Sequence, residues 1–100
     1  MKIMTFPKVE WKDVRRDLDA GDIISTVRNS CGRNKRVFKE GEVYCTEWGG
    51  KVKILKVKYY DDWRKFPTRK NWDDTMLSSI KYGIKMCGTD NLSHIHLRKL

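Results

Sequence analysis

The chain has 100 residues, of which 39% are hydrophobic and 11% aromatic, and this composition excludes a disordered tail. The length predicts one domain, over residues 1–100, with a single hydrophobic core. Lysine and arginine number 22 against 13 aspartate and glutamate, and the resulting formal charge of +9 favours a polyanionic partner.

Membrane spans, secretory signals and metal frameworks are not expected. The sequence holds no run near the roughly 18 apolar residues of a membrane helix, and its N-terminus lacks an apolar signal segment. We therefore expect a cytoplasmic protein without membrane contact. The cysteines, Cys31, Cys45 and Cys87, are odd in number and include no CxxC pair, so we expect no disulfide framework and no zinc site. We expect no cofactor either.

A strand, a helix and a second strand are predicted in the first 28 residues. Residues 1–6 alternate weakly and are followed by Pro7, as in a short strand. Residues 8–19 carry one apolar stripe at helical spacing, formed by Trp11, Val14 and Leu18. Gly21 is the stop signal of this helix, and the β-branched residues of 23–28 predict the second strand.

Ser25, Thr26 and Arg28 on the second strand are candidate ligand-binding residues. Hydroxyl and guanidinium groups bind phosphates, carbonyls and base edges. The alternation of a strand puts Thr26 and Arg28 on the same face. A buried Arg28 that pairs within the fold is the alternative interpretation.

A basic loop is predicted at residues 29–41, a segment rich in Asn, Ser and Gly. Within it, Arg33, Lys35 and Arg36 are suited to contact the backbone of a nucleic acid. A solvated loop without a ligand explains these charges equally well.

A hairpin is predicted from residues 43–48 to residues 51–60, with Gly49-Gly50 as a two-residue turn in which both positions tolerate positive φ. The apolar phase of the second strand changes after Ile54, which predicts a β-bulge and a strongly curved strand. Curvature of this kind suits a small barrel.

The return strand of this hairpin bears four lysines toward solvent: Lys51, Lys53, Lys56 and Lys58. If this strand binds a ligand, Lys53 is the candidate binding residue. A solvated edge that resists aggregation is the alternative.

Aromatic residues are candidate stacking platforms for bases. Trp63 is the best of them, because it lies in a polar loop directly before two basic residues. Tyr44, Trp48 and Trp72 are the other candidates, although Trp72 also fits the apolar stripe of a helix and Trp48 also fits a residue that covers the hairpin.

A second helix and a final strand complete the chain. Apolar residues recur about every four positions at Trp72, Met76, Ile80 and Ile84, and predict a helix over 72–86 with Asn71 as its N-cap. Residues 93–99 alternate as a strand. His94 and His96 share one face of it, but no third metal ligand is evident, so we interpret them as surface residues. This order of elements predicts an α+β fold, a small and mostly antiparallel β-barrel with two helices.

Six segments of the chain match a known pattern. They are Phe6-Pro7 after the first strand, Ala20-Gly21 after the first helix, Ser25-Thr26-Val27-Arg28 in the second strand, Phe38-Lys39-Glu40-Gly41-Glu42-Val43 before the hairpin, the basic return strand of the hairpin, and the closing strand at the C-terminus. With these segments the chain resembles the ASCH domains of the PUA-like superfamily over nearly its whole length. In the helix-exit motif of that family Gly21, Thr26 and Arg28 match, whereas Ile23 stands in place of a lysine and Ile24 in place of a threonine.

The resemblance implies a PUA-like barrel that binds RNA, nucleotides or modified bases. In family members similar to an acetylcytidine amidohydrolase, that lysine is catalytic, together with a threonine and a downstream glutamate. Because isoleucine can neither transfer a proton nor stabilise an oxyanion, Ile23 removes a central participant and we expect no catalytic residue.

We therefore expect a non-enzymatic RNA- or nucleotide-binding module whose basic cleft lies beside residues 25–28. The first alternative is a hydrolase, an amidohydrolase or ribonuclease, that acts on a modified nucleoside or on RNA. The second is a small viral or mobile-element protein that binds an acidic protein partner.

Overall fold

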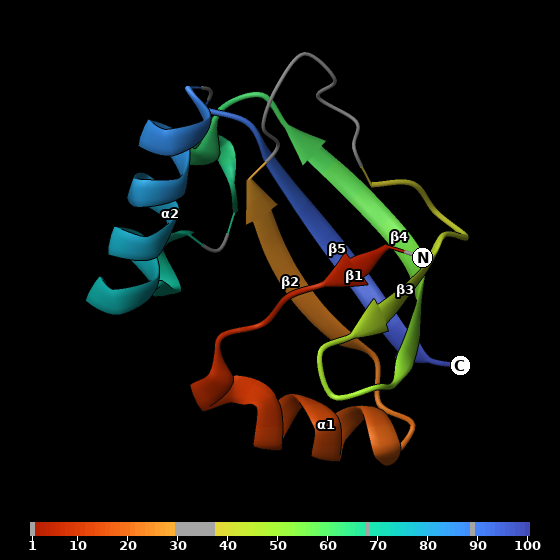
Figure 1. Ribbon diagram of the computed structural model, residues 1–100. Helices are drawn as coiled ribbons and strands as arrows, with labels where there is room; N and C mark the ends of the chain where they lie inside the picture. Colours follow the sequence, from red (N-terminus) through yellow and green to blue (C-terminus); the bar gives the residue numbers. More distant parts are fainter. Residues whose placement is uncertain (1, 30–37, 68, 89) are drawn as a thin grey trace. The chain divides into compact units, whose positions relative to one another are not determined.

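The computed structural model describes residues 2–29, 38–67, 69–88 and 90–100, and it shows an α+β fold with two helices and one five-stranded, mostly antiparallel sheet (Figure 1). The strands and helices are α1 (Trp11–Asp19), α2 (Asp74–Cys87), β1 (Ile3–Met4), β2 (Ile24–Asn29), β3 (Val43–Thr46), β4 (Lys51–Tyr60) and β5 (Leu92–Lys99). Three short 3-10 turns lie at Lys8–Glu10, Trp63–Lys65 and Arg69–Asn71.

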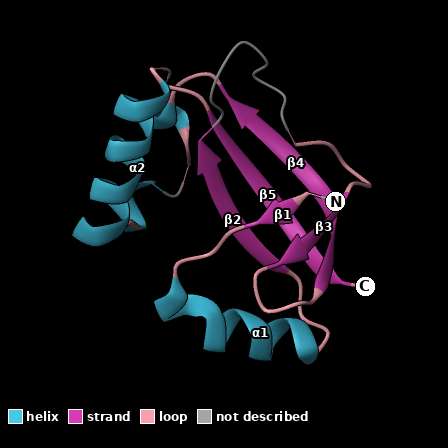
Figure 2. Cartoon of the chain, viewed as in Figure 1, coloured by secondary structure: helices cyan, strands magenta, loops and turns pink. Residues whose placement is uncertain are grey.

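The five strands are hydrogen-bonded in the order β1-β3-β4-β5-β2, which leaves β1 and β2 at the two ends of an open sheet (Figure 2). β1 pairs with β3 in parallel, with Ile3 opposite Cys45, and β3 pairs with β4 antiparallel, with Tyr44 opposite Val52. The predicted class and the two helices are confirmed. Closure into a barrel is not seen in this sheet.

The chain divides into two compact units. The first comprises Met1–Thr26, Phe38–Val57 and Ile95–Leu100, and the second comprises Val27–Val37 and Lys58–His94. The core of the first unit consists of side chains from β1, the segment that follows it, α1, β3, β4 and β5: Met4, Phe6, Leu18, Tyr44, Val52, Ile54, Ile95 and Leu97. The single domain predicted from the length stays a prediction.

Helix α1 follows the predicted pattern. Trp11 and Val14 pack against the core of the first unit, and Leu18 is part of that core. The helix ends at Asp19, and Gly21 adopts the left-handed conformation with φ of 85°, which allows the chain to leave the last turn.

The second unit has its own apolar cluster around α2. Phe66, Ile80 and Leu92 are buried at its centre. The predicted N-cap of α2 is wrong, because the helix begins at Asp74 and the side chain of Asp73 accepts a hydrogen bond from the backbone N–H of Met76 at 2.7 Å. An aspartate in this place suits the positive end of the helix dipole as well as the free N–H groups.

Cys87 is disulfide-bonded. The sequence predicts no disulfide framework, and this single bridge was not foreseen, because an odd number of cysteines excludes complete pairing but does not exclude one bridge. Among the described residues, neither helix combines the length and the apolar character that a membrane crossing needs.

Candidate functional site

The turn between β3 and β4 differs from the predicted two-residue turn. Thr46 accepts a hydrogen bond from the N–H of Gly49 at 3.1 Å and donates its own N–H to Gly50 at 2.9 Å, so three residues, Glu47, Trp48 and Gly49, form the turn. Only Gly49 of the two glycines has positive φ, at 88°. This is the geometry of a three-residue hairpin loop with a left-handed final residue, and it puts Trp48 at the tip.

The hairpin tip is held against the N-terminal segment. The carboxylate of Glu47 accepts the backbone N–H of Phe6 at 2.6 Å. The ring of Trp48 lies 5.7 Å from that of Phe6 and 5.9 Å from that of Trp11, distances typical of aromatic pairs. The indole of Trp11 in turn donates to the carbonyl of Phe6 at 2.8 Å. These contacts fix the indole of Trp48 beside α1.

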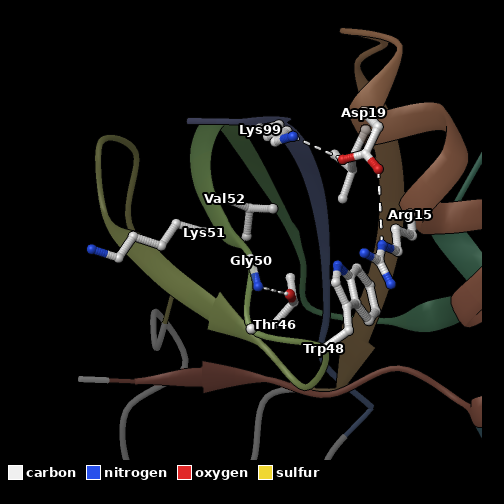
Figure 3. A pocket seen from close by; sticks show the side chains of 10 residues that line it. Arg15, Asp19, Thr46, Trp48, Gly50, Lys51, Val52 and Lys99 are labelled. Carbon is white, nitrogen blue, oxygen red and sulfur yellow. Dashed lines mark hydrogen bonds and ion pairs between the residues drawn. The ribbon is translucent and has the colours of Figure 1, made fainter.

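A hollow of about 290 Å³ lies between α1, this hairpin and the end of β5 (Figure 3). Its apolar lining residues are Leu18, Trp48 and Val52, and Gly49 and Gly50 carry no side chains into it. The lining residues are Arg15, Leu18, Asp19, Thr46, Trp48, Gly49, Gly50, Lys51, Val52 and Lys99.

A second hollow of about 370 Å³ continues along the same helix and shares three lining residues with the first, namely Arg15, Asp19 and Trp48. Its other lining residues are Trp11, Lys12 and Arg16. We call the two hollows together the α1 groove. They are of the size that binds small ligands.

The α1 groove is basic with one acidic residue. Among the described residues that line it, five are cationic: Lys12, Arg15, Arg16, Lys51 and Lys99. The acidic residue is Asp19, whose carboxylate lies 2.8 Å from the ammonium group of Lys99 and 3.9 Å from Nε of Arg15. The hydrogen bond from Lys99 lowers the pKa of Asp19 below its usual 3.8, so Asp19 carries a negative charge at neutral pH.

Gly49 is the residue on which this turn depends, and Gly49→Ala tests it. No atom lies within 4 Å of a Cβ added at Gly49, so the cost of the alanine is backbone strain alone. We expect a loss of about 1 kcal/mol in the free energy of unfolding, measured by urea titration. Gly49→Asn is expected to lose less, because asparagine tolerates the left-handed conformation. An unchanged midpoint for Gly49→Ala would contradict the positive φ.

The predicted ligand-binding residues of the second strand do not line the α1 groove. Ser25 is exposed, while Thr26 and Arg28 are half-buried on β2. Lys53, also half-buried, lies opposite Val43 in the β3–β4 pair. Ligand binding by these four residues stays a prediction.

The remaining candidates lie elsewhere. Arg33, Lys35 and Arg36 fall outside the described residues. Trp63 belongs to the second unit and is half-buried, with the guanidinium of Arg64 and the ammonium of Lys81 each 5.9 Å from its ring centroid.

Two of the other aromatic candidates have structural surroundings of their own. Tyr44 is buried in the core of the first unit, with 4% of its surface exposed, and is therefore no stacking platform. Trp72 precedes α2 and packs against Phe66 with ring centroids 5.2 Å apart. Among the described residues, no three His, Cys, Asp or Glu side chains gather as a metal site.

Sequence reasoning missed most of the groove. Lys12, Arg15, Arg16 and Asp19 follow one another at helical spacing on the polar face of α1, and this spacing was the available signal. The pairing of that face with Trp48 depends on contacts between distant parts of the chain.

The fold and the groove together define a small α+β protein with a basic, tryptophan-lined groove. Comparisons with protein-family models, with curated proteins and with solved structures found no match to this chain.

Proposed function

We propose that this protein is a non-catalytic RNA- or nucleotide-binding module and that the α1 groove is its binding site. One observation carries the proposal. The indole of Trp48, held at a hairpin tip, lines two adjoining hollows whose other side chains include five cations. Aromatic side chains interleaved with basic ones are what single-stranded nucleic acids bind.

The groove offers a place for each part of a nucleotide. A base can stack on the indole of Trp48, because every base has a π-face and stacking does not depend on the identity of the base. Arg15 and Lys51, which also line the first hollow, are the cations available for phosphate contacts. Gly49 and Gly50 carry no side chains into the first hollow, so a ligand can approach the backbone closely.

Lys51→Glu tests the phosphate contacts. Lys51 is exposed and its side chain forms no ion pair within the described part of the chain, so its replacement should leave the fold intact. We expect a labelled oligouridine of about twelve nucleotides to bind about tenfold more weakly to Lys51→Glu in fluorescence anisotropy. Binding by the unsubstituted protein should weaken with salt, with a slope of roughly 0.7 per phosphate contact.

Lys56→Glu is the matched control, because Lys56 is an exposed lysine of the same strand that does not line the groove. It changes the net charge equally, so its RNA affinity should fall less than about twofold if contact rather than total charge matters. Equal losses in the two variants, or an affinity that does not change with salt, would overturn the α1 groove as the RNA site.

The more detailed expectations from the sequence remain proposals. Support for the PUA-like barrel comes from the resemblance and from the five-stranded, mostly antiparallel sheet, and hydrogen bonds between β1 and β2 in an experimental structure would establish closure. A cytoplasmic location also remains a proposal, and the disulfide at Cys87 weighs against it, because disulfides are rare in reducing compartments.

A further inference from the structure

Asp19 differs from every other charged residue that lines the α1 groove. It is the acidic one among the described lining residues, and about half of its side chain, 51%, is exposed. Lys99 donates a hydrogen bond to Oδ1 at 2.8 Å, whereas Nε of Arg15 lies 3.9 Å from Oδ2, beyond hydrogen-bonding distance. In Figure 3 its carboxylate lies between these two cations. Oδ2 therefore has its acceptor capacity open to a ligand, and Oδ1 has a second acceptor site beside the one that Lys99 uses.

An ionised carboxylate beside a stacking platform discriminates among bases. A carboxylate only accepts hydrogen bonds, and two parallel ones are stronger than one. Guanine presents two neighbouring N–H donors, N1–H and the 2-amino group, on its pairing edge. Adenine and cytosine present one amino group next to a ring nitrogen that repels a carboxylate, and uracil presents a single N–H between two carbonyls.

We propose that the α1 groove selects guanine, with the carboxylate of Asp19 accepting N1–H and the 2-amino group while the ring stacks on Trp48. This inference rests on the proposed function, since it assigns the base that the same groove recognises. Lys99 has a positioning role, because its hydrogen bond to Oδ1 orients the carboxylate.

The test compares labelled oligouridines that differ in one central residue, which is guanosine, inosine, adenosine or uridine. Inosine retains N1–H but lacks the 2-amino group, so it isolates the second hydrogen bond. We expect the guanosine probe to bind about tenfold more tightly than the adenosine probe, with inosine between them. Asp19→Asn should reduce the ratio of guanosine to adenosine affinity to within about twofold, because an amide presents a donor as well as an acceptor.

Asp13→Asn is the control for this substitution. Asp13 is an exposed aspartate of the same helix that pairs with Arg16 at 3.2 Å and does not line the groove. Its variant should keep the guanosine preference, and circular dichroism should show that both variants are folded. Equal affinity for all four probes, or a guanosine preference that survives in Asp19→Asn, would overturn the inference alone. Failure of every probe to bind would overturn the proposed function as well.

Discussion

Replacement of Ile54 by alanine is expected to lower the free energy of unfolding by about 3 to 4 kcal/mol. Ile54 lies in β4 with 0% of its surface exposed and belongs to the core of the first unit. Its backbone N–H donates to the carbonyl of Glu42 at 2.9 Å, and its carbonyl accepts from Gly41 at 2.8 Å. These bonds hold the strand in place, so the neighbouring side chains cannot fill the cavity that alanine leaves.

Ile23→Ala is the matched control, because it removes the same atoms from a residue of the same unit that is 59% exposed. We expect a change within about 0.5 kcal/mol. Both values come from urea unfolding followed by circular dichroism, and Ile54→Val should fall between them at about 1 kcal/mol. Similar losses for Ile54→Ala and Ile23→Ala would contradict the assignment of the core.

Local periodicity was sufficient to predict several elements. The predicted bounds of the strand at residues 51–60 are those of β4. The stripe that begins at Trp11 and ends at Leu18 packs as expected on the core of the first unit. In α1 the pattern extends over enough residues that one face is much more apolar than the other, and burial of that face determines the structure. In β4 the apolar phase changes after Ile54, and the β-branched and aromatic residues on both sides of that change favour a strand.

Local signals failed where two nearby residues suit the same position equally well. Gly49 and Gly50 can both adopt positive φ, but only Gly49 does so. Thr46 holds both residues in place, because its carbonyl accepts the N–H of Gly49 and its hydroxyl accepts the N–H of Gly50 at 2.9 Å. Asn71 and Asp73 are both good N-caps, and the side chain bond to Met76 selects Asp73. Propensity alone ranks such residues nearly equally.

The candidate site was the least predictable part of the protein. Its tryptophan is fixed by Glu47 bonded to Phe6 and by a ring contact with Trp11, contacts that join residues about 40 positions apart. No short motif encodes such an arrangement. The polar helix face with Arg15 and the tryptophan beside two glycines can each be identified in the sequence. That they lie next to each other in space cannot.

Gly83→Ala is expected to destabilise the protein, although glycine is a poor helix former. Gly83 lies inside α2, where alanine ordinarily adds about 1 kcal/mol of stability. A Cβ at this position would collide with the side-chain oxygen of Asn29 and lie 2.6 Å from its Cγ. Since Nδ2 of Asn29 is buried, the amide has little room to move. We expect a net loss of about 1 to 3 kcal/mol in the free energy of unfolding.

A double-mutant cycle with Asn29→Ala identifies the cause. If the amide of Asn29 is what excludes a methyl group, Gly83→Ala should stop being destabilising in the Asn29→Ala background, with a coupling energy of about 1 kcal/mol or more. Ser79→Ala, at an exposed position of the same helix, should be slightly stabilising and shows the effect of propensity alone. The opposite result would be a Gly83→Ala protein stabilised by the roughly 1 kcal/mol expected at an open helix position. It would show that the side chain of Asn29 does not occupy this space and that no close approach of β2 requires a glycine here.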